Sequence, residues 1–275
     1  MNTFLVPTDF SETSKNAARF AANLANTTPD TELILYNVLD TIVAGADGSL
    51  LHSDDQARQT IAEMALNNVK TDLTDITSAP MKTVVEENHD FVGSLNRYVQ
   101  HNNVQLVIMG KTGVSRMGQI FVGSNTLKVV EKHAAPVMIV PHDAKFREIR
   151  NIMFISDFKD IEKAIPVNEL KNVLHLFRAN LHVVNVNAEH YVQVTEEYQT
   201  ERIKLENILE EFMPEFYFIR MYNFMEGVNQ FVTDKKIDLI VTIPKSHSFL
   251  SHFFTTSHTS QLAYQSHVPI LAVHS

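Results

Sequence analysis

The sequence repeats itself, and this internal repeat limits the possible folds more than any other feature. Residues 2–12 (NTFLVPTDFSE) resemble residues 150–160 (RNIMFISDFKD) at an offset of 148. Later in the chain the offset is 133, because residues 105–109 (QLVIM) resemble residues 238–242 (DLIVT). The same two offsets pair two further landmarks, Asn37 with Asn185 and Pro136 with Pro269. Two offsets that each match several landmarks indicate two tandem domains of one fold.

The first copy alternates strand-like and helix-like segments. Apolar runs such as residues 106–109 (LVIM) do not alternate with polar residues, as expected of parallel strands covered on both faces. The intervening segments carry apolar residues at helical spacing, as in residues 11–25. Alternating strands and helices of this kind indicate a doubly wound α/β fold. We predict one such domain over residues 1–142 and a second over residues 150–275.

Half of the glycines fall in one short segment. Four of the eight lie between residues 110 and 123, after a predicted buried strand and before a predicted helix. Glycine allows close backbone approach to a ligand, and free N–H groups at a helix start favour phosphate. Lys111 and Arg116 add positive charge nearby. A loop that needs glycine only for its own shape is the alternative, but the concentration of glycines and the flanking elements favour a phosphate site.

Composition and charge exclude several classes of protein. The net charge of −9, without a run of lysine or arginine, argues against a nucleic-acid partner. No stretch approaches the about 18 consecutive apolar residues of a membrane span. The first residues lack the basic start and long apolar run of a signal peptide, so we expect a cytoplasmic protein. The absence of cysteine excludes disulfides, thiolate metal sites and a cysteine nucleophile.

The glycine segment resembles the nucleotide-binding signature of the universal stress protein family, in its ATP-binding branch. The pattern here is Gly110-x2-Gly113-x9-Gly123-Ser124. Residues 6–11 (VPTDFS) resemble the family's first strand and turn, and residues 133–141 (HAAPVMIVP) resemble its last helix–strand junction. The resemblance covers the first copy fully and the second copy in outline.

This resemblance implies both a fold and a ligand. Each domain would be Rossmann-like, of the adenine nucleotide alpha hydrolase type, with a five-stranded parallel sheet of order 3-2-1-4-5 and helices on both faces. ATP would bind at the strand ends, usually with a divalent ion such as Mg²⁺. The implied nucleotide-binding residues are Pro7, Thr8, Asp9, Val38, Met109, Gly110, Gly113, Gly123, Ser124 and Asn125. Among them, Asp9 and Val38 would lie near adenine and ribose, while Gly123, Ser124 and Asn125 would hold the phosphates. No catalytic residue and no metal-ligating side chain is expected.

Asp9 has two interpretations. It follows a predicted strand, so its carboxylate is a candidate hydrogen-bond acceptor for a base or a sugar at the end of the sheet. It also lies just before a predicted helix, and Asp9-x-x-Glu12 resembles a capping box. The position at the strand end favours the first interpretation.

The second copy has lost the glycine signature. At the offset of 133, the four glycines become Ile243, Ser246, Ser251 and Thr256. β-Branched side chains and the missing N–H of Pro244 oppose close approach of a phosphate, so we expect this domain not to bind ATP as the first does. The loop at residues 244–254 carries His247 and His252, but their spacing matches no metal motif. A packed loop is therefore favoured over a metal site or a different small ligand.

Three classes of function remain open at this stage. The leading prediction is a stress-response regulator that binds an adenine nucleotide in its first domain, with a second domain that serves dimer-like packing or an unidentified protein partner. In that arrangement the last strands, residues 137–140 and 270–273, would pair within the chain, and a homodimer is a further option. The alternatives are a slow ATPase or nucleotidyl-transfer enzyme on the same fold, and a ligand-free scaffold. Turnover of Mg-ATP would separate the enzyme from the regulator.

Overall fold

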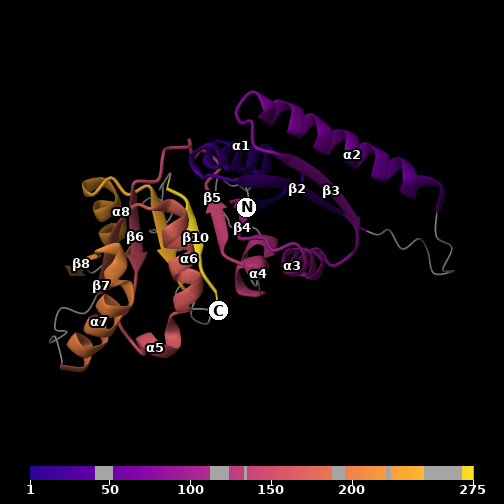
Figure 1. Cartoon of the computed structure of the whole chain (residues 1–275). Coiled ribbons are helices and arrows are strands. Elements are labelled where there is room, and N and C mark those ends of the chain that lie inside the picture. The colour runs from indigo at the N-terminus through magenta and orange to yellow at the C-terminus, as the bar shows by residue number, and fades with distance from the viewer. Residues whose placement is uncertain are drawn as a thin grey trace. The chain divides into compact units, whose positions relative to one another are not determined.

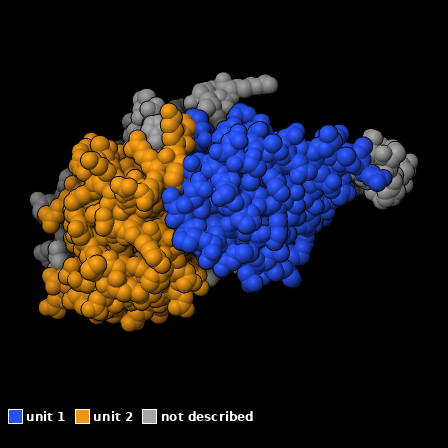
Figure 2. Space-filling model, turned by 45° about the horizontal axis from the view of Figure 1, so that its top comes forward, with its two compact units in different colours: residues 1–112, 123–142 blue, residues 113–122, 143–275 orange. Residues whose placement is uncertain are grey.

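The computed structural model of the chain describes residues 1–40, 52–111, 124–132, 135–187, 196–220, 224–244 and 268–274. These residues divide into two compact units, the first ending at residue 142 and the second beginning at residue 143 (Figure 2). Each unit is described by itself. Within the described ranges, no helix is long and apolar enough to cross a membrane.

The first unit alternates strands and helices along the chain. Its elements are β1 (Asn2–Pro7), α1 (Glu12–Thr27), β2 (Thr31–Leu39), α2 (His52–Thr74), β3 (Met81–Glu87), α3 (Phe91–His101), β4 (Leu106–Gly110), α4 (Ser124–Lys132) and β5 (Val137–Val140). The strands pair in parallel in the order β3-β2-β1-β4-β5. Helices α1 and α2 cover one face of this sheet, and α3 and α4 cover the other (Figure 1). Successive strands are added toward one edge of the sheet from β1 to β3 and toward the other edge from β4 to β5. The strand order therefore reverses between β1 and β4, where ligands bind in folds of this kind.

Burial explains why these segments form strands. In the central strand β1, the side chains of Phe4, Leu5 and Val6 are completely buried, because helices cover both faces of the sheet. The edge strand β3 is only partly buried, and its sequence mixes charged and apolar residues accordingly. The continuous apolar runs that predicted a parallel sheet thus lie in its centre.

The second unit has the same order of strands. Its elements are β6 (Asn151–Ile155), α5 (Ile161–Ala164), α6 (Val167–Phe177), β7 (Asn180–Asn187), α7 (Glu196–Leu209), the 3-10 turn η1 (Glu210–Phe212), β8 (Glu215–Arg220), α8 (Phe224–Asp234), β9 (Leu239–Thr242) and β10 (Ile270–Ala272). Parallel pairing gives the order β8-β7-β6-β9-β10. The predicted α/β fold with sheets of order 3-2-1-4-5 is confirmed. Two helices stand where the first copy has the single helix α1, and Pro166, which has no N–H, lies at their junction.

Ring contacts show that helices cover both faces of the second sheet. The centroid of the His182 ring, on β7, lies 6.1 Å from the centroid of the Phe231 ring, on α8. On the neighbouring strand, the ring of Phe218 lies 5.0 Å from that of Tyr198 on α7, whereas the adjacent Tyr217 contacts Phe231. Because successive residues of a strand point to opposite faces, α7 and α8 lie on opposite sides of the sheet.

Strand register locates the change of offset between the two copies. Ile34 pairs with Lys82 in the first unit, and His182 pairs with Glu215 in the second. The first members of these pairs differ by 148 residues and the second members by 133. The shorter connection in the second copy therefore lies between its second and third strands, in the segment that contains α7.

The backbones of the two copies share unusual conformations at matching positions. Phe10 and Phe158 both have a positive φ, of 65° and 50°. Asn103 and Lys236, which correspond at the later offset, have φ values of 48° and 51°. A positive φ is uncommon outside glycine, so its recurrence at matching positions shows that the repeat extends to local geometry.

Candidate functional site

A cavity of about 640 Å³ opens at the carboxyl ends of the strands of the first unit. It is lined by the ends of β1, β2 and β4, by the starts of α1 and α3, and by α4. Its volume falls in the range of roughly 300–1,000 Å³ that is usual for small-molecule sites. The cavity lies where the strand order reverses, which is the position that the doubly wound fold favours for a ligand.

The structure brings most of the implied nucleotide-binding residues to this one cavity. Seven of them line it: Pro7, Thr8, Asp9, Val38, Met109, Gly110 and Asn125. Ser124 is the first residue of α4, although its side chain is not described. Gly113 and Gly123 lie outside the described residues, as do Gly118 and Arg116.

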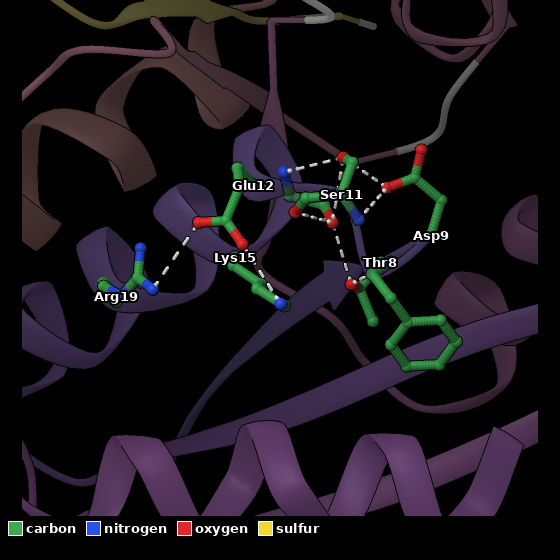
Figure 3. Close-up of polar contacts among 8 residues, drawn as sticks. Thr8, Asp9, Ser11, Glu12, Lys15 and Arg19 are labelled. Carbon is green, nitrogen blue, oxygen red and sulfur yellow. Dashed lines mark hydrogen bonds and ion pairs between the residues drawn. The ribbon is translucent and has the colours of Figure 1, made fainter. Parts of the chain in front are cut away.

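The turn after β1 is held by hydroxyl and carboxylate hydrogen bonds (Figure 3). Asp9 Oδ1 accepts hydrogen bonds from the backbone N–H of Ser11 at 3.1 Å and from its hydroxyl at 2.6 Å. The hydroxyl oxygen of Ser11 in turn accepts from the N–H of Ser14 at 3.2 Å and so caps α1. The capping-box interpretation is wrong, because Ser11 is the cap and Glu12 pairs instead with Lys15 at 3.1 Å. Asp9 fixes the cap residue and borders the cavity.

Asp9 is ionised at neutral pH. Partial burial raises the pKa of its carboxyl group, but the hydrogen bonds from Ser11 and Ser14 together outweigh burial. The pKa of Asp9 therefore lies below its ordinary value. The cavity has a fixed acceptor group at the end of β1, suited to hydroxyl or amino donors of a ligand.

Further hydrogen bonds, formed by Thr8 and Asn37, hold this turn in place. The Thr8 hydroxyl lies 2.9 Å from that of Ser14 and accepts a hydrogen bond from the N–H of Phe10 at 3.0 Å. The side-chain amide of Asn37, at the end of β2, donates to the carbonyl oxygen of Thr8 at 2.7 Å. Among the described residues Asn37 Oδ1 is buried without a hydrogen-bond partner, which is the kind of atom that a water or ligand satisfies. The sequence analysis assigned no role to Asn37, although its match to Asn185 was a signal.

Gly110 has a structural reason that differs from the one the sequence suggested. A Cβ atom at this position would lie 2.6 Å from the carbonyl oxygen of Thr13 and 2.8 Å from its Cγ2. Glycine is therefore required for α1 to pack against the end of β4. Close packing of two elements, rather than close approach of a ligand alone, accounts for this glycine.

Charged groups divide between the two sides of the cavity. Asp9, Asp40 and Asp90 line it from the side of β1, β2 and the loop after β3, whereas Lys128 and Lys132 line it from α4. Neither lysine was predicted from the sequence. Lys111 was predicted to add positive charge, but it is buried and is not among the residues that line the cavity.

Comparison with known proteins identifies the family. The universal stress protein family profile matches residues 1–141, about half of the chain. The chain belongs to the universal stress protein family. Universal stress protein MJ0577 of Methanocaldococcus jannaschii is 27% identical over 154 residues, which cover 50% of this chain and 92% of that protein.

Solved universal stress proteins share the fold across the whole chain. A structure from Archaeoglobus fulgidus has a TM-score of 0.71 at 17% identity and covers 98% of this chain and 97% of its own. A putative universal stress protein from Pseudomonas aeruginosa has a TM-score of 0.56 at 11% identity, covering 100% of this chain and 93% of its own. Identities this low show the fold alone. Because both structures cover nearly the whole chain, they show that fold in both halves of this universal stress protein.

The second unit keeps the same turn but fills the space beside it differently. The N–H of Phe158 donates to the Ser156 hydroxyl at 3.2 Å, as Phe10 does to Thr8 in the first copy. Here, however, Glu201 on α7 accepts from the N–H of Ile161 at 2.8 Å. The ring of Tyr198, also on α7, packs edge-on against Phe158 at 5.2 Å. Side chains of α7 thus contact the turn after β6 and the start of α5 in this universal stress protein.

The structure describes only part of the segment for which the sequence predicted a packed loop rather than a histidine metal site. His247, His252 and the rest of the loop beyond Pro244 lie outside the described residues. Within the described ranges, no group of three or more histidine or acidic side chains is arranged to hold a metal ion.

Proposed function

We propose that this universal stress protein binds ATP, or a related adenine nucleotide, in the cavity of its first unit and acts as a cytoplasmic regulator in the stress response. The observation that carries the proposal is the convergence of Asp9, Val38, Gly110 and Asn125 on one cavity at the start of α4. Gly110, the first glycine of the signature, thus lines a cavity of suitable size. The family supplies the role in stress response, and nucleotide-dependent change of a partner's activity is the proposed mechanism.

The residues at the cavity fit the chemistry of a nucleotide. The start of α4 offers backbone N–H groups and the positive end of a helix dipole to phosphate. Asp9 offers a charged acceptor to the hydroxyl or amino groups of ribose and adenine, and Thr8 lies directly beside it. These groups would orient the base and sugar toward β1 and the phosphates toward α4.

Magnesium fits the same site as a companion of the phosphates. Mg²⁺ keeps several waters and commonly binds through substrate phosphates with one or two carboxylates, so it requires no cage of protein ligands. Asp9, Asp40 and Asp90 also border the cavity but come from elements other than α4, so phosphates and waters would hold the metal and no side chain is assigned to it. The metal would neutralise part of the phosphate charge when the nucleotide is bound.

The second unit has a different proposed role. The glycines of the signature are absent from it, and Glu201 and Tyr198 contact the turn after β6 and the start of α5. We assign it to packing with the first domain or to binding of a protein partner, rather than to nucleotide binding.

Calorimetric titration of the nucleotide-stripped full chain with Mg-ATP tests this proposal. We expect one site per chain and turnover below about one ATP per minute, far under the usual range for enzymes. Two sites would contradict the role given to the second unit. Rapid hydrolysis would favour the enzyme alternative, and a chain that binds no adenine nucleotide would favour the scaffold.

A further inference from the structure

Two lysines on α4 line the cavity. Lys128 and Lys132 both line the cavity, and their spacing of four residues places them on one side of the helix. Neither forms a hydrogen bond or ion pair with any described residue, whereas Lys15 and Lys82 elsewhere in the unit are paired with glutamates. Two positively charged residues therefore line the cavity, and no described residue compensates their charge.

The negative charges of the cavity come from different elements than these two lysines. The three aspartates come from the half of the sheet formed by β1, β2 and β3, and the lysines come from the helix between β4 and β5. A ligand with donor groups at one end and anionic groups at the other matches this separation. Helix α4, which carries both lysines, packs beside α3 on the same face of the sheet (Figure 1).

The second copy shows what changes when the glycine signature is lost. At the offset of 133, Lys128 corresponds to Gln261 and Lys132 corresponds to Gln265, while Ser124 keeps its type as Ser257. Glutamine retains much of the length and polarity of lysine but carries no charge. Lys132 lies in the last turn of α4, where the helix dipole stabilises a positive charge. Lys128 lies in the middle of the helix, so the dipole does not explain a lysine there.

We propose that Lys128 and Lys132 bind the terminal phosphates of the nucleotide and make the cavity select nucleoside triphosphates over monophosphates. The inference rests on the proposed nucleotide function and deepens it, because it names the part of the ligand that is read and the residues that read it. Each further phosphate adds negative charge at the end of the ligand that faces α4, so affinity rises from AMP through ADP to ATP.

The test compares ATP, ADP and AMP by calorimetry on the full chain and on Lys128→Gln, Lys132→Gln and the double variant. Each single change should weaken ATP binding by about threefold to tenfold, as expected for a partly exposed ion pair with charge-assisted hydrogen bonds, and AMP binding by less than about twofold. Lys70→Gln on α2 is the matched control, because it removes the same charge outside the cavity. Circular dichroism and thermal melting show that each variant is folded.

The possible outcomes separate this inference from the function on which it rests. A wild-type chain that prefers ATP to AMP, with the preference reduced in both single variants and in the double variant but intact in Lys70→Gln, supports it. Equal ratios of ATP to AMP affinity in wild type and variants overturn it, although the nucleotide function stands. A wild-type chain that binds no adenine nucleotide overturns both.

Ionic strength gives a second readout that a purely structural role of the lysines would not change. If their charges contact phosphate, the preference for ATP over AMP decreases as salt rises, because screening weakens exposed charge pairs. The double variant should show a smaller salt dependence than wild type. An unchanged salt dependence contradicts the assignment.

Discussion

The side-chain amide of Asn37 donates a hydrogen bond to the backbone carbonyl oxygen of Thr8, with 2.7 Å between the two atoms. This bond ties the end of β2 to the turn that carries Asp9. The second unit has the same bond between Asn185 and the carbonyl of Ser156, at 2.9 Å. Both asparagines are buried, so the two copies fix the ends of their central strands in one way.

This duplication allows a paired test. Asn37→Ala and Asn185→Ala each remove a buried donor and should lower the free energy of unfolding of their own unit by about 1–3 kcal/mol. Only Asn37→Ala should also weaken Mg-ATP binding, because only its turn borders the cavity. Urea denaturation and calorimetry measure the two effects. Equal losses of ATP affinity in both variants would contradict the assignment of the site to the first unit.

Gly110→Ala should destabilise the first unit by about 1–3 kcal/mol, the usual cost of overpacking. The added methyl group meets the backbone of Thr13, which moves only if α1 moves. Because the nearest atom is a carbonyl oxygen, the second change Thr13→Ala should not restore the loss. Denaturant unfolding checks both variants. A wild-type unfolding midpoint for Gly110→Ala would show that the two elements have room that the structure does not indicate.

Gly123→Val tests the phosphate end of the signature. The side chain should block backbone donors from the phosphates and weaken ATP binding by at least about tenfold. Thr256→Val is the matched change at the corresponding position of the second copy and should leave the affinity unchanged. Calorimetry on both variants decides, and unchanged affinity in Gly123→Val would place the ligand elsewhere.

His274 predicts a loss of stability in mild acid. Burial lowers the pKa of this histidine from 6.5 to about 4, and its Nε2 atom has no hydrogen-bond partner among the described residues. Between pH 6.5 and about pH 4, His274 is protonated in the unfolded chain but stays neutral in the folded chain. The free energy of unfolding therefore falls across this range and levels off below it. His274→Met should lose less stability than wild type across this window in urea titrations. Parallel curves would contradict the prediction.

The fold was largely predictable because the repeat supplied each landmark twice. Continuous apolar runs located the buried strands, and the two offsets located the second sheet. Pro166 was visible in the sequence, but whether it bends or divides a helix depends on tertiary packing. The position of the shortened connection also required strand register, because the offsets only bracketed it.

The candidate site was less predictable, for reasons that particular residues show. Asp9 was found because it directly follows a strand, and strand ends meet at one edge of a parallel sheet. Lys128 and Lys132 were missed because two lysines four residues apart also describe an ordinary solvated helix face. Gly110 was identified for an incomplete reason, since the contact with Thr13 joins residues almost 100 positions apart.

The first strand of each unit is followed by a phenylalanine whose backbone has the left-handed conformation, and this affects how such a chain can be redesigned. A positive φ at a residue other than glycine costs about 1–2 kcal/mol, yet Phe158 keeps it in the copy without the glycine signature. Sequence divergence between the halves has spared this costly turn while replacing the glycine-bearing loop. The turn is thus part of the inherited scaffold. Grafting a nucleotide site into the second half would require changes in α7 and in the loop after β9, and none in the backbone around Phe158.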